Sequence, residues 1–259
     1  MCKTMKIITA ILIFFITYSF CNADKHGNIT INRKPISLIA IDPGFGGAEK
    51  GPSGCNNQAF AKDINLAISN RIAKKIENDL GLDVFLTRET DKFVSLEERV
   101  DIANVKNADL LISIHVNGYS DQNVYGIETY CLNIITDDDA IKTAITENTS
   151  SRENMQDMDI ILSGLMQNSQ VEESGLIAKI VHNSLISVLS AKYEKIKDRG
   201  VKNAPFYILL GASMPAIIVQ PAFITNKSEC ERLLTDEYQE TISSGIVKGI
   251  RQYIKGRMK

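Results

Sequence analysis

Helical spacing of apolar residues alternates along this chain with short, almost continuous apolar runs. The helical spacing predicts four helices, at residues 62–80, 95–107, 171–189 and around 242–250. In the first of them, isoleucines recur at every fourth position from Ile64 to Ile76, and Gly81 is a typical helix stop. The second begins with Ser-Leu-Glu-Glu from Ser95, which matches a capping box.

The apolar runs are short, and several are bounded by turn-forming residues, which is typical of strands. They lie at residues 37–41, 83–87, 110–116, 125–132, 201–210 and 216–219. Because these runs alternate with the predicted helices, the pattern favours an α/β fold with a mostly parallel twisted sheet flanked by helices. We expect a single domain over residues 37–256, interrupted by a polar insert at 137–168 that has weak periodicity.

The first 23 residues have the layout of a signal peptide. Two lysines precede an uncharged apolar run, Ile7–Phe20, and cleavage is predicted after Ala23. A polar leader, residues 24–36, follows. The sequence therefore predicts a secreted or periplasmic protein. Two alternatives stay open: an uncleaved membrane anchor, and a lipoprotein attached through Cys21.

Charge and cysteine content narrow the classes of partner. The chain has 29 basic and 31 acidic residues, and loss of residues 1–23 would leave 27 basic residues against 31 acidic ones. The chain therefore lacks the excess of basic residues that would indicate nucleic-acid binding. Cys55, Cys131 and Cys230 remain after cleavage, an odd number that implies no complete disulfide framework. We expect Cys131 to be buried and Cys55, on a glycine-rich loop, to be a candidate free thiol.

Nine segments follow one another along residues 37–254: the turn at 42–47 and the segments at 62–68, 86–91, 94–104, 113–117, 205–209, 214–219, 223–226 and 231–234. In this order they resemble the zinc-dependent N-acetylmuramoyl-L-alanine amidases, which hydrolyse bacterial cell walls. The resemblance implies the fold of that family, with peptidoglycan as the ligand.

The resemblance also implies a catalytic site, and this chain departs from it. Active members hold zinc through the histidine of D-P-G-H-G-G, a glutamate before the K-D of the first helix and the histidine of S-I-H-x-N, with a further glutamate as general base. The matching residues here are Phe45, Ala61, His115 and Gln220. Of the metal positions only His115 keeps its donor, and a glutamine side chain cannot accept a proton near neutral pH.

We therefore expect a cell-wall amidase-fold protein that has lost zinc and hydrolysis, and that binds peptidoglycan or a regulatory partner. No catalytic residue is expected intact, and His115 and Gln220 would be vestigial. The alternative is an active amidase with a rebuilt metal site. The candidates for new ligands beside His115 are Cys55, Asp42, Asp63 and Glu128, of which Asp42 and Asp63 also have structural explanations. A third possibility is a decaying paralogue without a specific ligand.

The insert at 137–168 resembles an insert of periplasmic division amidases, which covers the active site until an activator protein displaces it. The resemblance is carried by Glu147-Asn148, Glu153-Asn154 and residues 160–166. An acidic residue on such a helix can bind the zinc in those enzymes, and without zinc we expect that contact to have no role. The insert is thus a candidate surface for an activator-type protein, or simply a solvated loop with a helix packed on its own domain.

Overall fold

The computed structural model describes residues 35–133, 138–148 and 170–257. The predicted signal peptide, almost all of the polar leader and the insert beyond residue 148 lie outside this part of the chain. Within it, no helix is both long and apolar enough to cross a membrane.

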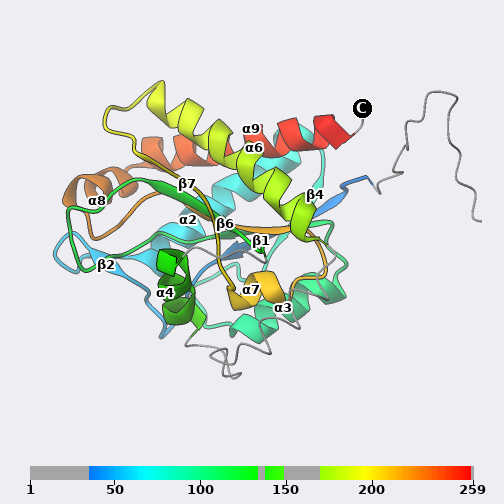
Figure 1. The fold of residues 1–259 in the computed structure, drawn as a ribbon, viewed down its shortest axis with the longest axis horizontal. Coiled ribbons are helices and arrows are strands. Elements are labelled where there is room, and N and C mark those ends of the chain that lie inside the picture. The colour runs from blue at the N-terminus through cyan, green and yellow to red at the C-terminus, as the bar shows by residue number, and fades with distance from the viewer. Residues whose placement is uncertain (1–34, 134–137, 149–169, 258–259) are drawn as a thin grey trace, which may run out of the picture. The chain divides into compact units, whose positions relative to one another are not determined.

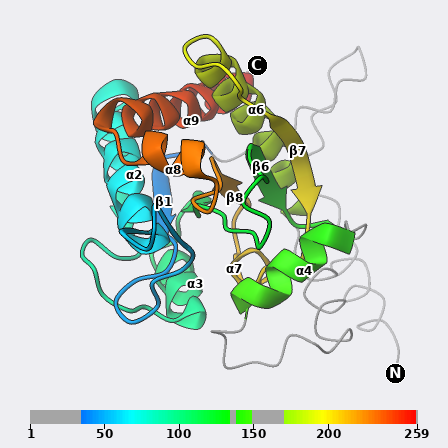
Figure 2. The same ribbon diagram turned by 90° about the vertical axis from the view of Figure 1, so that its left-hand side faces the viewer.

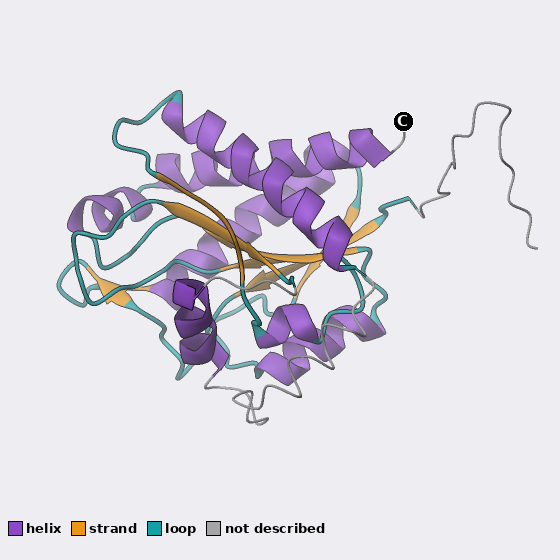
Figure 3. Ribbon diagram, in the orientation of Figure 1, coloured by secondary structure: helices purple, strands orange, loops and turns teal. Residues whose placement is uncertain are grey.

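A six-stranded sheet lies at the centre of the described fold (Figures 1 and 3). All neighbouring strands are parallel except β6 and β8, which are antiparallel. The mostly parallel sheet predicted from the sequence is therefore confirmed. In spatial order the strands are β4 (Asp83–Leu86), β1 (Leu38–Pro43), β5 (Leu110–Ile114), β8 (Ala216–Gln220), β6 (Ile127–Cys131) and β7 (Asp198–Asn203).

Helices cover both faces of the sheet (Figure 2). One face carries α2 (Ala61–Lys75) with the short π-helix η1 (Ile76–Leu80), α6 (Val171–Ser190), α8 (Lys227–Leu233) and α9 (Asp236–Arg257). The other carries α3 (Leu96–Val105), α4 (Asp138–Glu147) and α7 (Tyr207–Leu210). The apolar residues on the two faces form separate cores, which explains why the central strands are apolar on both sides.

The helix signals in the sequence are confirmed in detail. The four isoleucines from Ile64 to Ile76 are all buried against the sheet. Gly81 follows η1 with a left-handed φ of 65°, and the Ser95 hydroxyl accepts a hydrogen bond from the amide of Glu98 at the start of α3.

Some elements differ from the prediction. The single strand expected over residues 201–210 ends at Asn203, and Tyr207–Leu210 is the short helix α7. Pro205 lacks the amide hydrogen that a strand would donate, so the ladder stops before it. The helix α8 and the two-residue strands β2 (Ser53–Gly54) and β3 (Ala59–Phe60) were not predicted, because they are too short to show a period.

The prediction for Cys55 was wrong. Cys55 forms a disulfide with Cys230 of α8, across a sequence separation of 175 residues, and this bond ties the glycine-rich loop to α8. Cys131 is buried in β6, as predicted, with its sulfur 3.3 Å from Asn203 Oδ1. Cys55 is therefore neither an exposed thiol nor an available metal ligand.

Opening this disulfide should lower stability, because it closes a long loop in the unfolded chain. We expect the Cys55→Ser/Cys230→Ser variant, and the reduced parent, to lose about 2–5 kcal/mol of unfolding free energy. Urea denaturation with and without dithiothreitol measures this loss. The double variant is the control, since reductant should not change it further. An identical transition for the oxidised and reduced parent would contradict the assigned bond.

Candidate ligand groove at the carboxyl ends of the strands

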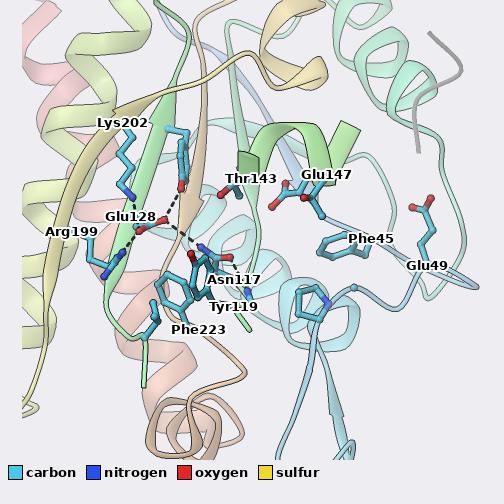
Figure 4. Close-up of a pocket in the computed structure, with 16 residues that line it drawn as sticks. Phe45, Glu49, Asn117, Tyr119, Glu128, Thr143, Glu147, Arg199, Lys202 and Phe223 are labelled. Atoms are coloured by element: carbon cyan, nitrogen blue, oxygen red, sulfur yellow. Dashed lines mark hydrogen bonds and ion pairs between the residues drawn. The ribbon is translucent and has the colours of Figure 1, made fainter. Parts of the chain in front are cut away.

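A cavity of roughly 620 Å³ lies beside the carboxyl ends of the sheet (Figure 4). Because β1, β5 and β8 are parallel, the segments that follow them meet at one edge. Asn117, after β5, forms an isolated bridge with Phe223, after β8. The turn after β1 contributes Phe45 to the cavity wall, and α4 contributes Glu147. The structure thus brings together segments that are far apart in the sequence.

Two buried arginines fix the turn after β1. Arg99 donates to the carbonyls of Pro43 and Phe45, at 2.7 and 2.8 Å. Arg88 donates to the carbonyls of Pro43 and Gly44, at 2.9 and 3.0 Å, and reaches α2 at the carbonyl of Lys62. Sequence reasoning placed both arginines in family-like segments but did not assign them this role.

Asp42 belongs to the same structural network. Its carboxylate accepts hydrogen bonds from Thr87 and Ser113 and forms an ion pair with Arg99 at 2.8 Å. Burial raises the pKa of Asp42, but Arg99 and the hydroxyl donors outweigh it and hold the pKa below its usual value. The carboxylate is therefore occupied within the protein and serves the turn, in agreement with its structural explanation.

The Phe45 ring packs against His115. The two ring centroids are 5.1 Å apart, with an interplanar angle of 62°, an edge-to-face arrangement. The backbone of Phe45 is left-handed, at φ 60°, which is unusual for a bulky residue. A Cβ on Gly51 would lie only 2.4 Å from the Phe45 ring, and one on Gly44 would lie 2.4 Å from His115 Nε2. Both glycines therefore leave the space that the two rings occupy.

The other two sequence-predicted positions are buried. Ala61 is the first residue of α2, and its methyl group lies in the core against which Phe45 packs. Gln220 ends β8, where its Oε1 accepts a hydrogen bond from Asn117 Nδ2 at 2.6 Å. Its Nε2 donates to Glu147 Oε1 at 3.0 Å. The glutamine thus links the floor of the groove to α4.

Glu147 is the site residue that sequence reasoning undervalued. One carboxylate oxygen lies 3.1 Å from Nδ1 of His115, a close contact although not an aligned hydrogen bond, while the other accepts from Gln220. The next residue, Asn148, exchanges hydrogen bonds with the backbone at Pro205 and Tyr207, which fixes the end of α4. The acidic contact expected from the resemblance is thus present, and the carboxylate has protein partners in His115 and Gln220.

Glu128 forms the centre of a second charged cluster. Arg199 Nε and Lys202 Nζ both bind its Oε1, at 2.5 and 2.7 Å, while Tyr130 and Asn117 donate to Oε2. Burial raises the pKa of Glu128, but these donors outweigh it and lower the pKa. Figure 4 shows Arg199 and Lys202 at the opposite side of the groove from Phe45 and Glu147.

The residues suggested as replacement metal ligands are not brought together. Cys55 is in a disulfide, Asp42 is bound by Arg99, and Glu128 is held by Arg199 and Lys202. Asp63 is exposed in the first turn of α2. Among the described residues, no three His, Cys, Asp or Glu side chains cluster as metal ligands do.

Glu229 of α8 supports one wall of the groove from behind. Its carboxylate accepts the amide hydrogens of Phe223 and Gly126, at 2.7 and 3.1 Å. Burial nevertheless dominates and raises the pKa of Glu229 to about 7.

The fold and the groove define an α/β protein with a candidate ligand site at the carboxyl ends of a mostly parallel sheet. A sequence profile of the N-acetylmuramoyl-L-alanine amidase family matches residues 39–252, and the chain belongs to this family.

Individual relatives are similar to most of this chain. The uncharacterized protein YqiI of Bacillus subtilis is 32% identical, over 83% of this chain and 84% of YqiI. The amidase AmiC of Escherichia coli O6:H1 is 30% identical over 85% of this chain, which spans 53% of AmiC, about half its length. The solved structure of the amidase AmiC2 of Nostoc punctiforme superposes with a TM-score of 0.63 at 30% identity, covering 85% of this chain and 97% of that one.

The contact between Gly44 and His115 gives a direct test of the site geometry. Gly44→Ala would place a methyl carbon only 2.4 Å from Nε2 of His115, so we expect a loss of about 1–3 kcal/mol in unfolding free energy. The matched control is Gly175→Ala in α6, where nothing lies within 4 Å and helix propensity should add about 0.5–1 kcal/mol. Urea denaturation measures both, and a stabilising Gly44→Ala would refute the packing described.

Glu229 makes stability depend on pH. Its pKa is raised on folding, so its contribution is complete below pH 4.5 and is lost as the pH rises through about 7. Over this window we expect the unfolding free energy to fall by at most about 1.4 kcal/mol per pH unit relative to Glu229→Gln. Denaturation of both proteins at pH 4.5 to 8 measures the difference. Parallel profiles for parent and variant would rule out this assignment.

Proposed function

We propose that this protein binds peptidoglycan fragments in its groove and does not hydrolyse them with zinc at the family's metal position. The observation that carries the proposal is the contact of Phe45 with His115. A hydrocarbon ring packs against the one imidazole that remains of the ligand set. In this proposal the protein keeps the fold and the ligand of the family but does not carry out its hydrolysis.

The donors beside the groove do not fit a catalytic zinc. Such sites have three protein ligands and an open position, whereas His115 and Glu147 supply two donors here. Glu147 is also hydrogen-bonded to Gln220. Gln220 stands where the family has its general base, and loss of a general base alone costs about 100- to 10,000-fold in rate.

Hydrolysis is the second candidate function, and family membership favours it. The family is one of zinc enzymes that cleave the bond between muramic acid and L-alanine, and AmiC and AmiC2 carry the amidase name. A zinc bound here would need at least one ligand besides His115 and Glu147. The four residues considered from the sequence are engaged elsewhere or exposed.

The groove has features that suit a glycopeptide. Tyr119 lies on its wall with more than half of its surface exposed, a platform on which a sugar ring can pack. Arg199 and Lys202 provide hydrogen-bond donors nearby. With the predicted signal peptide, we propose that binding takes place outside the cytoplasm. A regulatory protein that docks on the insert at 137–168 is also proposed, on the likeness to division amidases.

Zinc stoichiometry separates the two candidate functions. We expect residues 24–259, after incubation with zinc and removal of the excess, to retain well below one equivalent per chain. Phe45→His/Ala61→Glu restores two donor side chains at the matching positions and should retain about one equivalent, because three ligands suffice for a catalytic site. Atomic absorption measures the bound metal, and the double variant is the positive control for the assay.

The same preparations should be tested on isolated sacculi. The parent should co-sediment with sacculi without releasing peptide. One tightly held zinc in the parent, with peptide release that a chelator abolishes, would establish the hydrolase instead. A failure to co-sediment would contradict the binding function and leave the decaying paralogue.

A further inference from the structure

The groove carries opposite charges at its two ends. Glu49 and Glu147 line the end beside Phe45, whereas Arg199 and Lys202 line the other (Figure 4). A continuous chain of hydrogen bonds runs along the floor between them, from Glu147 through Gln220 and Asn117 to Glu128. The two ends therefore belong to one site, and its charge pattern fits a ligand with a positive and a negative group.

At the Phe45 end, the groove carries a negative charge, whereas a bound metal ion would be positive. The Glu147 carboxylate lies 3.1 Å from His115, the residue that matches a zinc ligand of the family. The aromatic ring of Phe45 lines the same end. A carboxylate beside an aromatic ring is a suitable environment for an ammonium group, because both the charge and the ring attract it.

At the opposite end, two cations share one carboxylate. Arg199 and Lys202 both bind Oε1 of Glu128, so this cluster has a net positive charge of one. Arg199 uses Nε for that contact, and its guanidinium carries four further N–H donors. Both side chains line the groove, and 27% of Arg199 and 21% of Lys202 is exposed to solvent. The end can therefore accept a ligand carboxylate.

We propose that the groove selects a short acidic peptide with a free amino terminus. The ammonium group would bind beside Glu147 and Phe45, and a carboxylate of the peptide would bind Arg199 and Lys202. This inference deepens the proposed function and rests on it, because it concerns the same groove.

Such a peptide is what hydrolysis of the muramoyl-L-alanine amide releases. Water adds across the C–N bond: the muramoyl carbonyl becomes a carboxylate, and the L-alanine nitrogen becomes an amine. An α-amino group has a pKa of about 8, so it is mostly protonated at neutral pH. In the uncleaved bond the same nitrogen is an uncharged amide. Glu147 would therefore distinguish the released peptide from the intact strand, and the protein would sense or carry the product of an active amidase.

Calorimetry with defined dipeptides tests this selection on residues 24–259. The probe is L-alanyl-glutamate, with glutamate in either stereochemistry, and the comparison ligands are its N-acetylated form and L-alanyl-glutamine amide. We expect N-acetylation to weaken binding about tenfold or more, the effect of losing one ion pair of about 1.4 kcal/mol. The glutamine amide, which lacks carboxylates, should weaken by a similar factor.

Substitutions assign each charge to its end of the groove. Glu147→Gln should bind the free and the acetylated dipeptide almost equally, whereas Arg199→Gln or Lys202→Gln should weaken both and keep the ratio between them. The controls are Glu172→Gln and Lys179→Gln, exposed positions on α6 that should change nothing. Thermal melts establish that each variant is folded before binding is compared.

The outcomes separate this inference from the proposed function. Equal binding of the free and acetylated dipeptides by the parent would overturn the inference. Co-sedimentation with sacculi without any dipeptide binding would also overturn it, while leaving peptidoglycan binding in place. Zinc-dependent peptide release together with selective dipeptide binding would overturn the proposed loss of hydrolysis but support the selection of a free amino terminus.

Discussion

The burial of two guanidinium groups beneath the turn after β1 is the constraint on which the rest of the groove depends. A buried charge is costly unless it is paired and fully hydrogen-bonded. Arg99 meets this condition through Asp42 and three carbonyls, and Arg88 through carbonyls of the turn, of α2 and of its own loop. Burial and the neighbouring Arg99 lower the pKa of Arg88 to about 10, which still leaves it charged at neutral pH.

This network fixes the backbone of the turn through its carbonyl oxygens, not through the side chain at position 45. The left-handed backbone of Phe45 is accordingly maintained by Arg99, which binds its carbonyl. Asn65 of α2 adds a further bridge, because it donates to the Gly44 carbonyl and accepts from the amide of Val116. The side chain that faces the groove can therefore vary while the turn keeps its shape.

The sequence allowed the layers of the fold to be predicted because they depend on periodicity. The isoleucines of α2 recur every fourth residue, and β1 and β5 are continuous apolar runs. The structure confirms the helix and the strands that these patterns predict. The disulfide was missed because Cys55 and Cys230 are 175 residues apart and no local pattern links them. The contact of Glu147 with His115 was undervalued for a related reason. The resemblance explains an acidic residue in the insert only as a group that binds the metal, whereas here Glu147 contacts the imidazole of His115 and the amide of Gln220.

The position of Glu147 also changes how the substitutions at the site are understood. On the resemblance to the family, Phe45, Ala61 and Gln220 taken singly would each be the loss of a donor or a base. With Glu147 present, Phe45 lines the groove beside a carboxylate, and the buried Gln220 donates to that carboxylate from below. A glutamate at position 220 would instead face Glu147 as a like charge, which is unfavourable in a groove with little solvent. Glutamine at this position and the carboxylate on α4 are thus mutually consistent, and glutamine lets the end of β8 bind α4.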